Sequence, residues 1–359
     1  MKCKKQIALL LTLIVVFSTL LVGCGSIGSN SNSEDDSSKN NKKTKVALLL
    51  AGYLGDKSFN DSANKGVEKA KEEFELEVKI METDKAADWE SNTMAMASSG
   101  EYDLILAVSA QYGDIFKEIA PQFPNQKFAI IDGVVDEPNV YSAIFAQNEG
   151  SFLAGAAAAL FTQKTNIKNV NEDKVIGWVG GVDIPVLQDF LTGYKQGAEY
   201  IDPSVKVISA FAGSFSDPLK GKELTLAQYS QGADIVMNVA SGTGNGVLEA
   251  AKESGKYAIG VDDNQDGLYP GNILTSMLKH VDITTYTIIK SVIDGNFKAG
   301  ETLYMDVING GVGLTDMSVM KEALGADFPE DILTKVKEIE EKIKSGEIKV
   351  KSHPGFGNK

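Results

Sequence analysis

The sequence contains no arginine: all 35 basic residues among its 359 residues are lysine. A guanidinium fork, which holds a carboxylate or phosphate through two parallel hydrogen bonds, is therefore not available for ligand binding. Lysine side chains and helix N-termini can still bind anions. This absence therefore favours a neutral or weakly charged ligand without requiring one.

Histidine and cysteine are also scarce. His280 and His353 are the only histidines, and Cys3 and Cys24 are the only cysteines. Zinc sites and Ser-His-Asp hydrolases need clusters that contain these residue types. No nucleophile is paired with a base in the sequence either. We therefore expect no metal site, no cofactor and no catalytic activity.

A long apolar run begins near the N-terminus and extends from Ile7 to Val22, about sixteen residues. It follows three lysines within residues 2–5 and leads through residues 21–24 (LVGC) into Cys24. The run is short for a membrane-spanning helix, and this order of basic, apolar and small residues before a cysteine is typical of a bacterial lipoprotein signal. We predict a signal peptide at residues 1–23, removed once the Cys24 thiol carries diacylglycerol. The alternative is a plain transmembrane anchor with an incidental cysteine.

The part of the chain after this signal is strongly acidic. Removing residues 1–23 takes away three lysines and no acidic residue, which moves the formal charge from -14 to -17. Such a body does not attract nucleic acid through its overall field. No basic amphipathic surface helix is apparent, so lipid on Cys24 has to supply the membrane contact. We expect a monomer at the extracytoplasmic face of a Gram-positive cell membrane, with residues 24–44 as the lipidated cysteine and a flexible tether.

From Lys45 onward, short β-branched runs alternate with amphipathic segments. Near-continuous apolar strands separated by helices predict parallel sheets covered on both faces. About 315 residues are too many for one such sheet, so we expect two lobes. A charged helix is expected at 329–347, and the tail after Lys351 is expected to be loose. The expected strands are 45–51, 77–81, 103–108, 127–131, 141–146, 174–179, 205–211, 234–240, 257–261 and 273–277; the expected helices between them are 61–75, 88–99, 114–120, 151–163, 186–200, 218–230, 245–254 and 282–294.

An internal similarity supports two related lobes. Residues 103–132 and 234–262 each begin with Asp, continue as a strand, a small-residue loop and a helix, and end with a strand that finishes in Asp. Any βαβ unit shares some of this pattern, so coincidence stays open. If the similarity is real, equivalent strand ends of the two lobes face one cleft, where ligands bind in open α/β sheets.

Two loops at matching places each carry a phenylalanine among glycine, serine and aspartate. Phe59 lies in residues 52–61, after the first strand, and Phe215 lies in residues 213–217, after the strand at 205–211. On opposite sides of a cleft, the two rings would suit a flat ligand ring, with stacking worth roughly 1–3 kcal/mol per face. The alternatives are that Phe215 belongs to the core and that Asn60 or Asp61 is an ordinary helix N-cap.

Polar candidates follow the other strands. Asp132 and Asp262 end their strands, and Lys279 lies just past the strand at 273–277. A carboxylate beside an ammonium reads vicinal hydroxyls well, although Asp262 could also be a solvated charge. The loop at 241–246 (SGTGNG) has GxGxG spacing, unlike the GxGxxG of dinucleotide sites. Its glycines, Gly244 among them, would let the backbone approach a ligand.

Seven segments follow one another in this order: DKSFND (56–61), QNEGSFLAGAAAAL (147–160), GSFSD (213–217), ASGTGNG (240–246), GVDDNQ (260–265), TSMLKHVD (275–282) and GGVGL (310–314). They resemble the basic membrane protein (BMP) family of ABC-transporter substrate-binding lipoproteins, in its purine-nucleoside receptor group. Together they span nearly all of residues 45–315, which makes the match specific. The sequence departs from the family pattern at Asn264 and in the loop at 109–113.

The resemblance implies a type I periplasmic-binding-protein fold, with two Rossmann-like α/β lobes, a ligand cleft and three hinge crossovers. Lobe 1 would comprise 45–146 plus about 278–306, and lobe 2 would comprise 147–277 plus about 307–350. By the family pattern, Phe59 and Phe215 sandwich the base. The base edge and nearby polar contacts fall to Asn60, Asp61 and Asp132. The ribose hydroxyls are held at Asp262 and Lys279, with the Gly244 backbone close by.

The implied function is capture of a purine nucleoside (adenosine, guanosine or inosine) for an ABC permease and its ATPase subunits. A binding protein for a sugar, a nucleobase or a signalling ligand is a first alternative, because paired aromatics also stack on sugar rings. A lipoprotein nucleoside hydrolase is a second, although such enzymes use a calcium-binding aspartate cluster and the candidate aspartates here are divided between lobes. An adhesin or surface antigen is a third, and that role could coexist with transport.

Overall fold

The computed structural model describes residues 43–356. The predicted signal peptide, the predicted lipidation site at Cys24 and most of the predicted tether lie outside this range. Residues from Lys43 onward belong to one compact unit. Within the described range, no helix combines the length and the apolar character needed to cross a membrane.

Lobe 1 is built on a six-stranded sheet, sheet A, in which every strand pair is parallel. Its central strands are apolar on both faces: all residues from Val46 to Leu50 are fully buried. This is the pattern of a parallel sheet covered by helices on both sides. In spatial order the strands are β11 (Thr302–Met305), β5 (Val140–Phe145), β4 (Phe128–Ile131), β3 (Leu104–Val108), β1 (Thr44–Ala51) and β2 (Leu76–Thr83).

Lobe 2 repeats the arrangement around sheet B, which also has six strands. The pairs are parallel except at the edge, where β12 runs antiparallel to β10. The two α/β lobes with parallel-sheet cores confirm the fold class expected from the alternating pattern. In spatial order the strands are β12 (Val312–Leu314), β10 (Ile273–Lys279), β9 (Tyr257–Asp262), β8 (Ala233–Val239), β6 (Val175–Gly180) and β7 (Lys206–Phe211).

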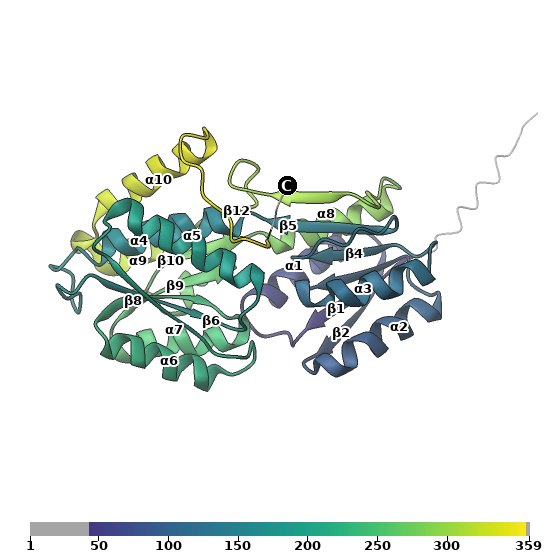
Figure 1. Cartoon of the computed structure of the whole chain (residues 1–359), viewed down its shortest axis with the longest axis horizontal. Helices are drawn as coiled ribbons and strands as arrows, with labels where there is room; N and C mark the ends of the chain where they lie inside the picture. The colour runs from purple at the N-terminus through teal and green to yellow at the C-terminus, as the bar shows by residue number, and fades with distance from the viewer. Residues whose placement is uncertain (1–42, 357–359) are drawn as a thin grey trace, which may run out of the picture. The chain divides into compact units, whose positions relative to one another are not determined.

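Helices cover both faces of the sheets (Figure 1). In lobe 2, α4 and α5 lie on one face of sheet B and α6 and α7 on the other (Figure 1). In lobe 1, α1 and α8 pack closely against each other: a Cβ added at Gly66 would lie 2.2 Å from the Asp282 carbonyl oxygen. The helices are α1 (Phe59–Glu73), α2 (Trp89–Ser99), α3 (Gly113–Ile119), α4 (Gln147–Phe161), α5 (Pro185–Ile201), α6 (Pro218–Ser230), α7 (Gly244–Ser254), α8 (Val281–Ile293), α9 (Ser318–Leu324) and α10 (Glu330–Lys344).

The chain passes between the lobes three times. It leaves sheet A after β5 to form α4, leaves sheet B after β10 to form α8, and leaves sheet A again after β11 to form β12. Strand β10 continues to Lys279, two residues beyond the expected strand, so the second passage follows Lys279. Lys279 is therefore the last residue of the strand.

The C-terminal tail differs from the expectation. The tail after Lys351 was expected to be loose, but the buried carboxylate of Asp189 on α5 accepts hydrogen bonds from Ser352 Oγ at 2.6 Å and from the His353 amide at 2.7 Å. Phe356 is 9% exposed. The expectation was wrong because the partners of the tail lie far away in the sequence, on α4 and α5.

Candidate functional site: a cleft between the lobes

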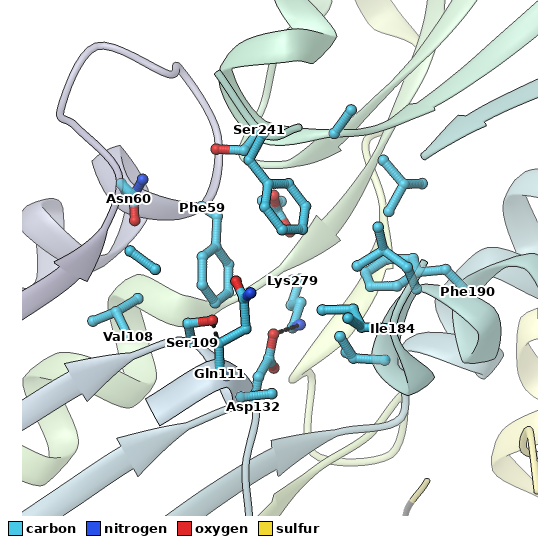
Figure 2. A pocket seen from close by; sticks show the side chains of 18 residues that line it. Phe59, Asn60, Val108, Ser109, Gln111, Asp132, Ile184, Phe190, Ser241 and Lys279 are labelled. Carbon is cyan, nitrogen blue, oxygen red and sulfur yellow. Dashed lines mark hydrogen bonds and ion pairs between the residues drawn. The ribbon is translucent and has the colours of Figure 1, made fainter. Parts of the chain in front are cut away.

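A pocket lies between the two lobes at the carboxyl ends of their strands (Figure 2). Residues at or after the ends of β1, β3 and β4 form one wall, and residues from β8, β9, β10 and the start of α5 form the other. The cavity volume is about 60 Å³. One water needs about 10–15 Å³ on this measure, so a ligand larger than a few waters must fit closely or part the lobes. This is where open α/β sheets bind ligands.

Three phenylalanines give the pocket its aromatic character. Phe59 is the first residue of α1, Phe190 lies on α5, and Phe215 lies in the loop before α6. Figure 2 shows Phe59 and Phe190 on different sides of the pocket, with Lys279 and Asp132 between them. The Phe215 ring packs directly over Gly181: a Cβ at that glycine would lie 2.3 Å from Phe215 Cδ1. The glycine therefore makes room for the ring.

Lys279 is the one cation among the eighteen residues that line the pocket. It is 1% exposed, and its Nζ lies 2.6 Å from Asp132 Oδ2 across the two lobes. The same Nζ lies 5.1 Å from the Phe59 ring centroid and 5.2 Å from that of Phe190. Ring faces attract a cation at such distances, so the aromatic walls and the ion pair together hold this buried charge.

Asp262 is the second acidic group at the pocket, 8% exposed and at the end of β9. The Ser58 hydroxyl donates a hydrogen bond to its Oδ2 at 2.5 Å. Burial raises the pKa of Asp262 to about 7, because the desolvation of its charge outweighs the opposing effects of Lys279 and the Ser58 hydrogen bond. Near neutral pH this carboxyl is therefore able to accept or donate a hydrogen bond.

Two buried oxygens at the pocket have no hydrogen-bond partner within residues 43–356: Oδ1 of Asn60 and Oδ1 of Asp132. Asn60 is 3% exposed and Asp132 is 6% exposed. Buried polar atoms in folded proteins nearly always have a partner. Both acceptors line the pocket, so a ligand with N–H or O–H donors can supply the missing hydrogen bonds.

The structure brings six of the eight predicted contact residues to this pocket: Phe59, Asn60, Asp132, Phe215, Asp262 and Lys279.

The other two predicted residues do not line the pocket. The Asp61 carboxylate turns back and accepts hydrogen bonds from the Gly55 and Lys57 amides, at 2.7 and 2.8 Å. Gly244 packs on Asn238 instead, where an added Cβ would lie 1.9 Å from Asn238 Oδ1. Each shapes a loop beside the pocket.

Several lining residues were not named as ligand contacts from the sequence, although the loops at 109–113 and 241–246 were noted. Ser109 and Ser241 follow the equivalent strands β3 and β8, so the internal similarity could have found them. Ile184 and Phe190 come from the start of α5, where no motif marks them. They reach the pocket only through the packing of α5 on sheet B.

Hydrogen bonds between the lobes hold them together beside the pocket. The loop before α1 provides most of them: Asp56 Oδ2 accepts from the Ser241 hydroxyl at 2.6 Å, and the Lys57 carbonyl accepts from Gln265 Nε2 at 2.8 Å. Burial raises the pKa of Asp56, although the Ser241 hydroxyl and three backbone amides oppose the shift. The lobes are therefore closed around the pocket by bonds that a hinge opening would break.

The described residues 43–356 contain no group of three or more His, Cys, Asp or Glu side chains placed to hold a metal ion. The pocket therefore offers aromatic faces, hydrogen-bond acceptors and one buried cation as its chemistry.

Comparison of the sequence with known proteins identifies the family of this chain. The family model described as "ABC transporter substrate-binding protein PnrA-like" matches residues 43–353. The CD4+ T-cell-stimulating antigen of Listeria innocua is 32% identical, over 98% of this chain and 99% of the relative. Basic membrane protein D of Borreliella burgdorferi is 34% identical, over 89% of this chain and 90% of the relative.

A solved structure with a similar fold supports the same family. The solute-binding protein of an ABC transporter system from Aeropyrum pernix K1 has a TM-score of 0.81 and 31% identity, covering 87% of this chain and 94% of that one. The chain therefore belongs to the Bmp family of PnrA-like substrate-binding proteins of ABC transporters.

Proposed function

We propose that this chain captures purine nucleosides in the interlobe pocket and delivers them to an ABC permease with its ATPase subunits. The observation that carries the proposal is that Phe59 and Phe215 line one pocket together with Asp132, Asp262 and Lys279. The two phenylalanines come from matching loops of the two lobes. Two aromatic side chains together with acceptors and a cation suit a ligand with a flat ring and several hydroxyls.

The base is assigned to the aromatic part of the pocket. Purine rings stack on phenylalanine faces, and their edges carry N–H donors. The unpartnered Oδ1 atoms of Asn60 and Asp132 would accept from such donors. Asp61 would act indirectly, by fixing the loop that carries Phe59.

The sugar is assigned to Asp262 and Lys279. A carboxyl and an ammonium beside each other can accept from one hydroxyl and donate to the next. Gly244 would support this part of the site by keeping the 241–246 loop tight against Asn238. No group in this assignment acts as a nucleophile, in agreement with a family of binding proteins.

Delivery follows from closure. A ligand that contacts both lobes favours the closed state, because only there are both sets of contacts made. The interlobe bonds of Asp56 and Lys57 would form together with ligand contacts. We further propose that lipid on Cys24 anchors the protein at the extracytoplasmic face of a Gram-positive cell membrane, so that the closed form meets the permease there.

Calorimetry on a lipid-free form, residues 25–359, tests the ligand. Adenosine, guanosine and inosine are titrated, with ribose and AMP as controls. We expect micromolar or tighter binding of nucleosides alone, about -8 kcal/mol or better. Binding of ribose without any nucleoside would replace the proposal with a sugar receptor. Release of free base during incubation would point to a hydrolase.

The Phe215→Ala variant tests the sandwich. We expect nucleoside binding to weaken by roughly 1–3 kcal/mol, because one stacking face is lost. Phe297→Ala is the matched control, since that ring packs edge-on against Tyr141 in lobe 1 and does not line the pocket. Unchanged affinity in the Phe215 variant would remove the aromatic sandwich from the proposal.

A further inference from the structure

The C-terminal segment 351–356 (KSHPGF) crosses from α10 toward the space between the lobes (Figure 1). It is short and polar apart from Phe356, a composition that does not order a chain end by itself. Its order therefore has to come from contacts with the rest of the protein.

The contacts come from α4 and α5 of lobe 2. Gln196 makes two bonds with the backbone of Lys351: Nε2 donates to the carbonyl at 2.8 Å, and Oε1 accepts from the amide at 3.0 Å. One residue earlier, the Val350 carbonyl accepts from Asn148 Nδ2 at 3.1 Å. The start of the segment is thus fixed to lobe 2.

The strongest anchor is Asp189, a fully buried carboxylate on α5. Its Oδ1 accepts from Ser352 Oγ and from the His353 amide, while Oδ2 accepts from Gln147 Nε2 at 2.6 Å. Burial raises the pKa of Asp189, and the hydrogen bonds from the tail oppose that shift. A buried carboxylate is costly unless it is hydrogen-bonded, so removing the tail would leave Oδ1 without two of its donors.

A tight turn then directs Phe356 inward. The Phe356 amide donates to the His353 carbonyl at 3.1 Å, and Gly355 has φ 96°, a backbone conformation that favours glycine. Phe356 is 9% exposed as a result.

Phe356 borders an outer chamber of the cleft, which is about 430 Å³ in volume. Phe356 and Gly355 line it on the tail side, and Gly133 and Val134 of lobe 1 line it opposite. Gln111 and Asp132 line both this chamber and the inner pocket, so the two spaces adjoin. The tail therefore stands beside a route from solvent to the inner pocket.

We propose that residues 351–356 form a strap, with Phe356 as its inner wall, that closes the outer chamber and retains ligand in the cleft. The strap is fixed to lobe 2 and faces lobe 1 across the chamber, so it limits access without spanning the hinge. The choice of inosine as the ligand in the kinetic test below rests on the proposed function. The proposal that the strap closes the chamber does not depend on that function.

A thiol probe tests the closing without any ligand. Residues 25–359 contain no cysteine, so Gln111→Cys provides a single thiol at the junction of chamber and pocket. We compare its labelling rate by a maleimide in the otherwise unchanged chain, in a chain ending at Val350, and in the Phe356→Ala chain. We expect labelling about ten-fold faster after truncation and several-fold faster with Phe356→Ala, as protection by local structure is lost.

Ser99→Cys serves as the control, because Ser99 is exposed at the end of α2 and no route to it passes the tail. Its rate should be the same in all three backgrounds. Circular dichroism and the thermal midpoint establish that each variant is folded. If truncation unfolds the chain, Phe356→Ala and Ser352→Ala keep the test open, since both leave the backbone anchors at Gln196. Equal Gln111→Cys rates in folded variants overturn the strap.

The kinetic test uses inosine displaced from the protein in a chase experiment. We expect its dissociation rate to rise about ten-fold in the chain ending at Val350, since changes at a binding site act mostly on the dissociation rate. An unchanged rate in a chain that binds inosine removes the retaining role. If the intact chain binds no nucleoside, the proposed function fails, while the thiol result still decides whether the strap closes the chamber.

Discussion

Asp132 directly follows β4 and Asp262 ends β9, the equivalent strand of the other sheet; both have a left-handed backbone, with φ 70° and 65°. Non-glycine residues rarely adopt this conformation, and it concentrates at functional sites. Here it turns one carboxyl from each lobe into the same pocket. Lys279 pairs with Asp132 and also lowers the pKa of Asp262, so a single ammonium serves both carboxyls.

This relationship predicts a large effect of Lys279→Met. The change leaves Asp132 and Asp262 buried without their cation, and breaking a buried pair from one side costs about 3–5 kcal/mol of unfolding free energy. Urea denaturation of the ligand-free chain measures it. The double variant Lys279→Met, Asp132→Asn should recover part of the loss.

Lys335→Met is the matched control. Lys335 pairs with Glu338 on the surface of α10, with side chains 49% and 54% exposed. Such pairs contribute less than about 1 kcal/mol. A loss for Lys279→Met no larger than for this control would show that the buried pair does not stabilise the closed lobes.

The raised pKa of Asp262 predicts how stability depends on pH. Its pKa is about 7 in the folded chain against an ordinary value of 3.8. Between these values the folded state binds more protons than the unfolded state, so this group's contribution falls as pH rises from about 4 to about 7. The loss amounts to roughly 4 kcal/mol at most, at 1.36 kcal/mol per pKa unit.

Asp262→Asn isolates this effect. The variant should gain stability relative to the original chain as pH rises from 4 to 7, and the difference should level off above 7. Denaturation at four or five pH values measures the difference. The exposed Asp114→Asn change should give no such rise. A flat difference for Asp262→Asn would mean that the carboxyl is ionised throughout the window.

The sequence predicted the fold well where local pattern and burial agree. Each of the ten expected strands is present, with ends within two residues of those predicted. Most of these strands are apolar runs buried on both faces, and such runs can be recognised from the sequence alone. Strands β11 and β12 were missed because both are short edge strands that are only partly buried, and helix α9 was missed because Met320 is its only buried residue. Such short elements form by pairing or packing with distant neighbours.

In the candidate site, too, residues next to a strand end could be predicted from the sequence, whereas residues placed by tertiary packing could not. Phe59 and Asp132 could be placed because a strand end and a loop next to it locate them. Phe190 could not, because it reaches the pocket from the second turn of α5 through tertiary packing. Asp61 shows the opposite failure: its neighbour Asn60 lines the pocket, but one residue further along a helix turns the side chain by about 100°. Motif membership alone does not show which side chains face a ligand.

The anchoring prediction concerns Cys24, outside the described residues. Cys24→Ala removes the thiol that would carry lipid, so we expect the chain to lose acyl incorporation and to stay unprocessed or leave the membrane fraction. Fractionation of cells fed labelled palmitate measures both. Cys3→Ala is the control, since residue 3 would be removed with the signal. Acylation that persists in the Cys24 variant would contradict the lipoprotein signal.

The contact between α4 and α5 predicts that Gly155 tolerates no side chain. A Cβ there would lie 2.0 Å from the Tyr194 carbonyl oxygen, and Gly193 and Gly197 are equally close to the α4 backbone. Because backbone cannot move aside as a side chain can, Gly155→Ala should lower the unfolding free energy by about 1–3 kcal/mol or more.

Gly113→Ala is the matched control, with helical φ -56° and no atom within 4 Å of the added Cβ. It should be neutral or stabilise by about 0.4–1 kcal/mol, because alanine restricts the unfolded chain. Urea midpoints compare the two variants. Equal midpoints would mean that α4 and α5 can move apart without loss of unfolding free energy. The helices that anchor the C-terminal strap would then not be rigidly packed on each other.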